Sequence, residues 1–256
     1  MTPSRLVPAL SHNAVSPKVS PKVSPKVVDD VNAFENVGRP TMADIEFFFD
    51  PVCPWAWITS RWVAEVGRQR ELNVEWRFIS LRILNDQKNY ESDFPAGYIP
   101  GHTTGLKLLR VCAAANKAEG PARVAELYTQ FGGDIHVRGR REEMTDHWEA
   151  GFPEYLRSVG CAAYLEAAND ESIDEELRAS TQEALLRTGK DVGTPIISYT
   201  RDGLTQSFFG PVISQVPPAD QAGRLWDAMW EIATFPGFAE LKRSLRDRPQ
   251  LATSLD

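Results

Sequence analysis

The clearest hydrophobic pattern in the chain begins at residue 45 and predicts a strand, a helix and a second strand. Residues 45–49 form a short apolar, aromatic-rich run that ends at Asp50, which is typical of a buried strand. Between residues 54 and 69, apolar side chains recur every three to four positions, which predicts an amphipathic helix. Residues 74–79 alternate between apolar and polar side chains, as expected of a second strand. The three elements make a βαβ unit.

The rest of the chain predicts a block of helices, followed by a hairpin and a last helix. Glycines separate apolar runs of helical spacing between about residues 101 and 189. The predicted helical stretches lie around residues 106–113, 124–131, 152–158, 162–168 and 173–188. Residues 194–199 then predict a strand, and residues 205–209 its hairpin partner across the turn at 201–203. A final amphipathic helix is predicted over residues 221–233.

The order of these elements predicts the fold class and the domain organisation. A βαβ unit, a helical block and a ββα unit follow one another, which is the order of an α/β, thioredoxin-like fold with an inserted helical subdomain. We therefore expect one domain over residues 42–256, with the helical insertion at about residues 101–189.

The first 41 residues have a different character. Ser-Pro-Lys-Val occurs three times in succession over residues 16–27, and proline at every fourth position prevents a helix. We expect residues 1–41 to form a disordered N-terminal extension. Its three lysines could bind an acidic partner, although a solvated tail is the simpler interpretation. Met42 follows directly and offers an alternative start of the chain.

Composition and charge exclude several classes of function. The 256 residues are 42% hydrophobic and 25% charged, and the formal net charge of −7 argues against a nucleic-acid partner. No apolar run approaches the roughly 18 residues that a membrane helix needs. Three cysteines cannot build a disulfide framework, and their spacing shows no zinc signature, so we expect no metal. Residues 6–10 are too short for the apolar part of a signal peptide, so we expect a cytoplasmic protein.

Cys53 is the candidate catalytic residue because it precedes a proline at a turn from strand to helix. Pro54 is well suited to the first helical position, which makes Cys53 the N-cap. The unpaired backbone N–H groups and the positive end of the helix dipole then point at the sulfur. Both favour the thiolate, so we expect a pKa below the free value of about 8.5 and a nucleophilic sulfur. We interpret Cys112 and Cys161, which lie among apolar residues, as buried and inert.

The sequence around Cys53 resembles a known family. The stretch DPVCPWAWITSRW at residues 50–62 resembles the active site of actinobacterial DsbA-like proteins, particularly mycothiol-dependent nitroreductases. Further matches are SLRILN at 80–85, GTP at 193–195, FFGP at 208–211, LWD at 225–227 and FAELK at 238–242, and the resemblance covers about residues 44–243.

The resemblance implies a DsbA-type fold and a site for a small thiol. It implies a cis peptide bond between Thr194 and Pro195, whose backbone would pair with a thiol substrate beside Cys53. The substrate-binding residues that it implies are Pro54, Trp55, Asn85, Tyr98, Thr194 and Pro195. Mycothiol or a similar low-molecular-weight thiol would be a co-substrate, with no tightly bound cofactor. The partner is thus a small thiol or disulfide, and the sequence predicts no oligomeric state.

One departure from the family pattern changes the expected chemistry. The usual motif is Cys-Pro-Trp-Cys, but this chain has Ala56 at the fourth position, so a disulfide between residues 53 and 56 is excluded. We therefore expect a monothiol oxidoreductase, in which nitroreduction by the dithiol route is in doubt. Two alternatives stay open: a thiol transferase or isomerase resembling kappa-class glutathione transferases, and a non-catalytic binding protein. We expect His136 to have a hydrogen-bonding role, and Arg61 could modestly stabilise a thiolate.

Overall fold

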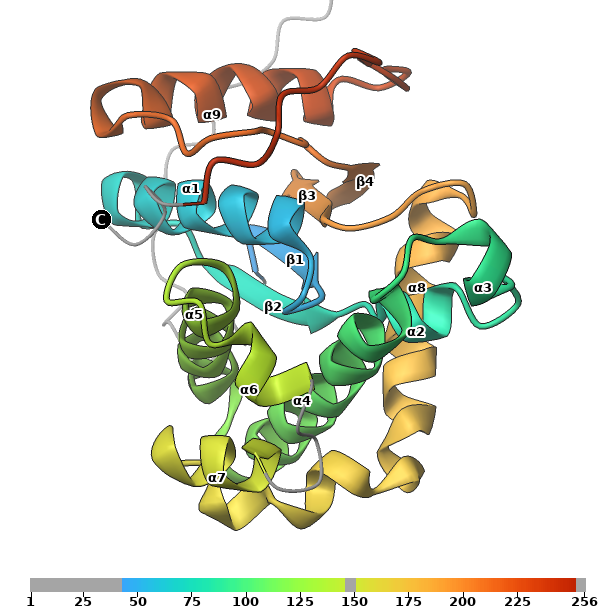
Figure 1. Cartoon of the computed structure of the whole chain (residues 1–256). Coiled ribbons are helices and arrows are strands. Elements are labelled where there is room, and N and C mark those ends of the chain that lie inside the picture. The colour runs from blue at the N-terminus through green and yellow to red at the C-terminus, as the bar shows by residue number, and fades with distance from the viewer. Residues whose placement is uncertain (1–42, 146–150, 252–256) are drawn as a thin grey trace, which may run out of the picture. The chain divides into compact units, whose positions relative to one another are not determined.

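The computed structural model describes residues 43–145 and 151–251 (Figure 1). The predicted disordered extension and Met42 lie outside the described residues.

A four-stranded sheet forms the centre of the described fold. Its strands are β1 (Ile45–Phe49), β2 (Val74–Phe78), β3 (Ile196–Arg201) and β4 (Leu204–Phe209), in the order β2-β1-β3-β4. β1 pairs with β2 in parallel and with β3 antiparallel, so that Phe47 lies opposite both Trp76 and Ile197. β4 pairs antiparallel with β3. All four strands appear where the hydrophobic pattern predicts them.

One face of the sheet packs against two helices. Helix α1 (Pro54–Arg70) connects β1 to β2, and helix α9 (Ala219–Thr234) follows β4 and lies next to α1 (Figure 1). Trp62 of α1 joins the two helices, because its indole N–H donates a hydrogen bond to the Ala222 carbonyl at 3.0 Å and its ring meets Trp226 edge-on at 5.6 Å.

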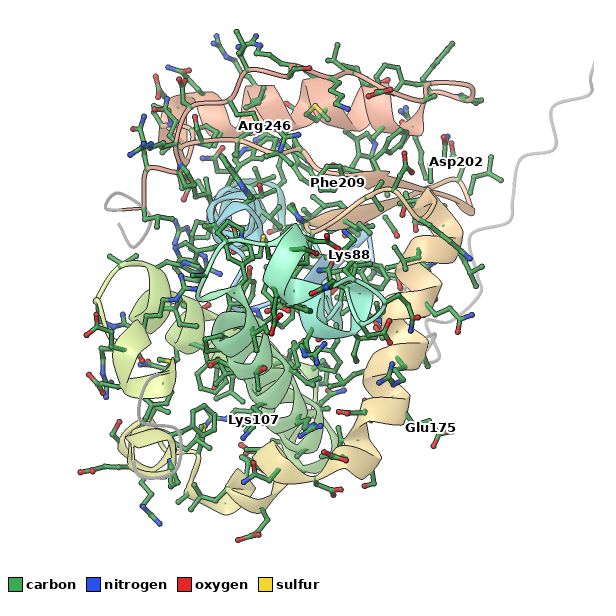
Figure 2. The ribbon with its side chains drawn as sticks, turned by 45° about the vertical axis from the view of Figure 1, so that its right-hand side comes forward. Lys88, Lys107, Glu175, Asp202, Phe209 and Arg246 are labelled. Carbon is green, nitrogen blue, oxygen red and sulfur yellow. The ribbon has the colours of Figure 1, made fainter. Side chains whose placement is uncertain are left out.

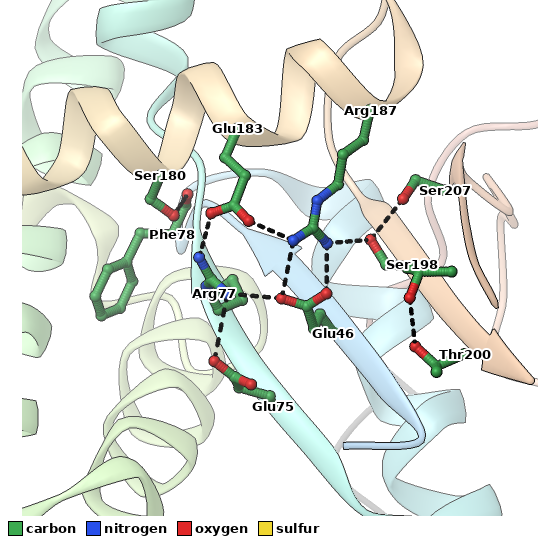
Figure 3. A network of polar contacts seen from close by, with 11 residues as sticks. Glu46, Glu75, Arg77, Phe78, Ser180, Glu183, Arg187, Ser198, Thr200 and Ser207 are labelled. Carbon is green, nitrogen blue, oxygen red and sulfur yellow. Dashed lines mark hydrogen bonds and ion pairs between the residues drawn. The ribbon is translucent and has the colours of Figure 1, made fainter. Parts of the chain in front are cut away.

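The opposite face packs against α8 (Asp174–Thr188). Because successive side chains of a strand point to opposite faces, Phe48 lies on this side while Phe47 and Phe49 lie in the main core. A small apolar cluster forms here from Phe48, Ile79, Ala184 and Ile196. Beside it, Glu46, Arg77, Glu183, Arg187 and Ser198 form a network of ion pairs and hydrogen bonds across β1, β2, β3 and α8 (Figure 3).

The described chain between β2 and β3 consists of helices and short helical turns. The helices before α8 are α2 (Leu81–Leu84), α3 (Tyr90–Asp93), α4 (Tyr98–Glu119), α5 (Pro121–His136), α6 (Arg141–Thr145) and α7 (Gly151–Ser158). The helices α2, α3 and α6 have four or five residues each, too few to show a period, and none of them was predicted. The helix predicted at 162–168 is wrong: two 3-10 turns, Ala162–Tyr164 and Glu166–Asn169, lie there instead and pack against α4. Packing across α4 therefore overrides the local helical propensity.

The hairpin between β3 and β4 closes as its sequence predicts. Asp202 and Gly203 form the two-residue turn, with φ values of 53° and 78°. Two positive φ angles are what a type I′ turn requires, and Asp-Gly is a favoured pair for it.

This topology is the thioredoxin-like fold. A parallel βαβ unit and an antiparallel ββα unit share one sheet, with the helical block inserted between them. The predicted α/β, thioredoxin-like class is therefore confirmed. No helix in the described part of the chain is both long and apolar enough to cross a membrane.

Candidate functional site

Cys53 caps the N-terminus of α1. Its backbone is extended (φ −81°, ψ 114°), Pro54 takes the first helical position, and the Ala56 N–H points at Sγ with a separation of 3.5 Å. The loop that leads to it is a tight turn, because the Cys53 N–H donates to the Asp50 carbonyl at 3.0 Å. The sulfur therefore stands at the helix end, as the sequence predicts.

The loop before β3 lies against the other side of the thiol. The Cys53 thiol donates a hydrogen bond to the Thr194 carbonyl at 3.4 Å, and the Thr194–Pro195 peptide bond is cis. Thr194 Oγ1 bonds the Phe48 carbonyl at 3.2 Å, and the Pro195 carbonyl accepts the Gly210 N–H at 2.8 Å. Tertiary structure thus brings Cys53 and Pro54 next to Thr194 and Pro195, which are about 140 positions away in the sequence.

The electrostatic environment of Cys53 differs from the sequence expectation. Burial raises the pKa of the Cys53 thiol to about 12, although hydrogen bonds from the backbone N–H groups of Ala56 and Trp55 lower it and the charge of Asp50 raises it further. The expected pKa below 8.5 is therefore wrong for the unliganded protein. Only 5% of Cys53 is exposed, so the lost hydration of a thiolate outweighs the helix N-terminus.

Asp50 is a site residue that sequence analysis treated only as the end of a strand. It is fully buried, and its carboxylate oxygens accept the N–H groups of Val52 at 3.0 Å and Leu81 at 2.8 Å. Burial raises the pKa of this carboxyl to about 7 against the opposing effect of these two bonds. Gly105 of α4 packs directly on it, since a Cβ there would lie 2.5 Å from Asp50 Oδ1. An acidic residue directly after a buried strand was the available signal.

His136 and Arg61 support the loop and the helix without bonding the thiol. His136 Nε2 donates to the Pro51 carbonyl at 2.9 Å, and its ring stacks on Trp57 at 5.9 Å. Burial lowers the pKa of His136 to about 4, so the ring is neutral at pH 7 and the hydrogen-bonding role is confirmed. The Arg61 guanidinium lies 4.2 Å from the centre of the Trp57 ring and bonds Thr129 Oγ1.

The other predicted binding residues occupy separate positions. Trp55 lines a cleft beside β4. Asn85 ends α2, and its side-chain amide donates to the Leu81 carbonyl at 2.8 Å within the same turn. Tyr98 begins α4, is 44% exposed and stacks on Phe94 at 5.5 Å. No hydrogen bond or ring contact among the described residues joins Asn85 or Tyr98 to Cys53.

The remaining cysteines lie in the helical block. Cys112 is part of α4 and Cys161 follows α7, and both are buried and free. Burial raises the pKa of each thiol. Ala56 occupies the first turn of α1, so the structure places no second thiol three residues after Cys53. Over residues 43–145 and 151–251 no cluster of His, Cys, Asp or Glu is arranged to hold a metal ion.

A thioredoxin-like fold with a cysteine at the start of α1 and a cis-proline loop against it defines a protein of the thioredoxin superfamily. The family model of the Rv2466c-like proteins, described as mycothiol-dependent nitroreductase Rv2466c, matches residues 52–243. The chain therefore belongs to the Rv2466c-like family, as its motifs indicate. Membership places it among thiol-dependent oxidoreductases.

The matches to individual proteins span most of each relative's own length. An uncharacterized protein of Mycobacterium tuberculosis, Rv2286c, is 30% identical over 208 residues, which are 79% of this chain and 82% of that protein. Among solved structures, the cytosolic disulfide reductase DsbM from Pseudomonas aeruginosa is 19% identical and covers 74% of this chain and 99% of its own, with a TM-score of 0.44. A 2-hydroxychromene-2-carboxylate isomerase is 13% identical, covers 72% and 93%, and has the same TM-score.

Proposed function

We propose that this protein is a monothiol oxidoreductase in which Cys53 exchanges with mycothiol or a similar small thiol. One observation carries the proposal: Cys53 Sγ lies between the Ala56 N–H at the start of α1 and the Thr194 carbonyl of the cis-proline loop. In this position, the sulfur can react with the sulfur of a substrate disulfide that pairs with the backbone of the cis-proline loop. The reaction belongs in the cytoplasm, where small thiols are kept reduced.

The exchange balances without a second protein thiol. The sulfur of Cys53 attacks one sulfur of a substrate disulfide, the substrate S–S bond breaks, and a mixed disulfide forms on Cys53. The proton of the Cys53 thiol passes to the leaving sulfur. A small thiol then attacks the mixed disulfide, forms a new S–S bond with the bound group and returns the proton to Cys53. Across the two steps, the leaving group is reduced to a thiol, the attacking small thiol is oxidised, and one disulfide bond is exchanged for another.

The backbone of Thr194 supports the first step. In the unliganded protein its carbonyl holds the thiol proton at a sulfur-to-oxygen distance of 3.4 Å. A substrate that pairs with this backbone displaces the bond and frees the proton for the leaving sulfur. Pro54, Trp55, Thr194 and Pro195 then surround the bound small thiol.

The outer part of the pocket follows from family resemblance. We assign Asn85 and Tyr98 to it, with the exposed Tyr98 ring available to cover a sugar or an aromatic ring. Nitroreduction that ends in a disulfide between residues 53 and 56 has no place here, because residue 56 is alanine.

Intact-mass analysis tests the proposed function. Incubation with mycothiol disulfide, or with glutathione disulfide as a substitute, should add one small thiol to Cys53, and added free thiol should remove it. A protein with Cys112 and Cys161 replaced by serine should behave in the same way, whereas Cys53→Ser should give no adduct. An adduct confined to Cys112 or Cys161, or none on Cys53, would rule the proposal out.

The raised pKa of Cys53 favours one alternative. A thiol that stays protonated can donate its hydrogen bond to the thiolate of a bound cofactor, as in a transferase or isomerase that forms no protein adduct. Cys53→Ser separates the two functions, because a serine hydroxyl also donates. Transferase or isomerase activity should survive that change, whereas thiol exchange should be lost. Absence of both activities in the wild-type protein, with small-thiol binding alone, would indicate a non-catalytic binding protein.

A further inference from the structure

The two edges of the sheet are built differently. β2 forms one edge and carries Glu75 and Arg77, and Arg77 is held in the network with Glu46 and Glu183 (Figure 3). Charged side chains of this kind are a common protection of an edge strand against pairing with another chain. β4 forms the other edge, has the sequence LTQSFF and contains no charged residue. The edge at β4 therefore lacks the protection that β2 has.

The main chain of β4 presents bonding groups away from the sheet. Arg201 and Leu204 flank a two-residue turn and form a hydrogen-bonded pair, so hydrogen-bonded and non-bonded pairs alternate from there. Thr205, Ser207 and Phe209 fall at the non-bonded positions, which directs their N–H and C=O groups outward. The described structure records no backbone hydrogen bond from these three residues to any other element.

A cleft of about 1650 Å³ lies along this edge. All of β4 beyond Leu204 lines it, together with α9, the end of α8 and the C-terminal segment 238–247. Figure 2 labels Phe209 on β4 and Arg246 on the C-terminal segment, two residues of the cleft wall. Apolar side chains that include Phe208, Met229 and Phe238 make part of the lining, which suits the alternate side chains of an extended peptide.

The C-terminal segment is attached to the domain at its two ends. Phe238 packs on Phe208 at 5.8 Å, and the Gln250 N–H donates to the Ser214 carbonyl at 2.7 Å. Between them, the structure shows no backbone hydrogen bond from residues 239–249 to the rest of the described chain. Among the described residues, this wall of the cleft therefore makes no backbone hydrogen bond to the outward N–H and C=O groups of β4.

The cleft leads to the thiol site. Trp55, two residues after Cys53, is part of its lining, as are Gly210 and Pro211. The Gly210 N–H bonds the Pro195 carbonyl at 2.8 Å, and Thr59 of α1 donates to the Pro211 carbonyl at 2.8 Å. A chain that runs along β4 toward Phe209 is therefore directed to the cis-proline loop beside Cys53.

We propose that this cleft binds an extended polypeptide that pairs with the edge of β4, and that the substrate disulfide joins a cysteine of that polypeptide to a small thiol. The inference rests on the proposed function and names its substrate class. Cys53 attacks the sulfur of the small thiol, the peptide leaves as a free thiol that takes the proton, and the small thiol remains on Cys53. A second small thiol attacks that mixed disulfide, which yields the small-molecule disulfide and restores Cys53.

The geometry favours a peptide over a second copy of this chain. A six-residue strand spans about 20 Å, which an extended peptide matches with one strand. A second copy that paired through its own β4 would bring its own segment 238–247 to the same edge, where the first segment already forms a wall.

The test compares a peptide disulfide with a small disulfide. The probe is an uncharged peptide of about eight residues, with alternating apolar side chains and one cysteine joined to glutathione. Glutathione disulfide serves as the small substrate. Ser207→Pro removes the outward N–H and is tolerated at an edge strand, whereas Ser207→Ala keeps that N–H and equally removes the Ser198 contact.

We expect Ser207→Pro to lower the ratio of the peptide rate to the small-disulfide rate about tenfold, and Ser207→Ala to retain that ratio. Anisotropy of a labelled, cysteine-free peptide on Cys53→Ser, with and without Ser207→Pro, measures docking apart from chemistry and should show the same loss. Thr205→Lys, which adds a charge to the edge, replaces Ser207→Pro if the latter does not fold.

The outcomes separate this inference from the proposed function. An equal ratio of the peptide rate to the small-disulfide rate in Ser207→Pro and Ser207→Ala would overturn the peptide site. It would leave the proposed monothiol exchange intact. A second outcome is that no adduct forms on Cys53 while Ser207→Pro still loses peptide binding. That result would support the docking edge and overturn the exchange. A dimer in sedimentation that Ser207→Pro dissociates would assign the edge to a second copy and overturn the peptide proposal.

Discussion

At the scale of single residues, Cys53 shows how one position receives two opposing influences. The helix N-terminus supplies N–H groups that favour the thiolate, while burial removes the water that a thiolate needs. The effect of burial on the pKa dominates in the unliganded protein because only 5% of Cys53 is exposed. In the proposed exchange, substrate binding displaces the Thr194 carbonyl from the thiol and thereby changes this balance.

The first prediction concerns alkylation of Cys53 against pH. With a pKa of about 12, the thiolate fraction should rise about tenfold for each pH unit between about pH 7 and pH 10, and the rate of modification with it. Peptide mass spectrometry after iodoacetamide treatment measures the rate, and Cys53→Ser supplies the blank. A plateau near pH 7 would show that the helix N-terminus dominates over burial.

The second prediction concerns the buried carboxyl of Asp50. Its pKa rises from an unfolded value near 3.8 to about 7, so the folded protein holds this proton more tightly and loses stability as pH rises between those values. Asp50→Asn is neutral throughout, so the stability of wild type relative to the variant should fall by about 4 kcal/mol over this window.

Urea unfolding at several pH values between about 4 and 8 measures this difference. Asp202→Asn, in the exposed hairpin turn, is the matched control for the substitution itself. A constant difference between wild type and Asp50→Asn would contradict the raised pKa. Because the charge of Asp50 also raises the pKa of Cys53, alkylation of Cys53 should be faster in Asp50→Asn.

At the scale of elements, close approach between helices and the active-site loop depends on glycine. A Cβ on Gly105 would lie 2.5 Å from Asp50 Oδ1, and one on Gly132 of α5 would lie 2.2 Å from the ring of Trp57. Neither neighbour can move freely, because Asp50 is held by two N–H groups and Trp57 is fully buried. These glycines let α4 and α5 pack directly beneath the loop and helix that carry Cys53.

The third prediction uses two glycines in helices. Gly105→Ala should lower the free energy of unfolding by about 1–3 kcal/mol, because the added methyl displaces a buried carboxylate. Gly67→Ala in α1 is the control, since its nearest neighbour would be the Leu72 carbonyl at 3.9 Å. That change should add about 0.5–1 kcal/mol through helix propensity. Chemical denaturation measures both changes. Equal changes in the free energy of unfolding for the two variants would show that α4 is not closely packed against the loop.

At the scale of the whole domain, the polar network on the α8 face joins the inserted helical block to the sheet. Glu46 of β1 accepts from Arg77 of β2 at 2.6 Å and is also paired with Arg187 of α8. Its side chain is 15% exposed, so loss of its charge leaves two partly buried arginines short of a partner. α8 and the central strands are therefore stabilised together.

The fourth prediction compares two glutamates that share Arg77. Glu46→Gln should lower the free energy of unfolding by about 2 kcal/mol. Glu75→Gln removes the charge of a 47% exposed side chain 3.4 Å from the same guanidinium and should change it by less than about 0.5 kcal/mol. Denaturant midpoints of the two variants give the comparison. Similar losses of unfolding free energy in Glu46→Gln and Glu75→Gln would mean that the network stabilises the fold no more than an exposed ion pair does.

Much of the fold could be predicted from the sequence because local patterns and global packing agree. Short apolar or alternating runs located all four strands, helical spacing located the helices α1, α4, α5 and α9, and Asp202-Gly203 marked the hairpin turn. The segment at 162–168 failed because contact with α4, which lies far away in the sequence, decides its conformation. The single turns α2 and α3 were too short to carry a period.

For the site, the sequence by itself determined the thiol, its place at a helix start and the absence of a second thiol at residue 56. These depend on residue identity and on neighbours within one turn, which the sequence contains. Only the tertiary structure decided that Thr194 meets Cys53, that Asp50 is buried beneath the loop, that His136 bonds Pro51, and that burial reverses the expected shift of the Cys53 pKa. Contact across long separations and exclusion of water arise only when distant segments pack together, and no local pattern encodes them.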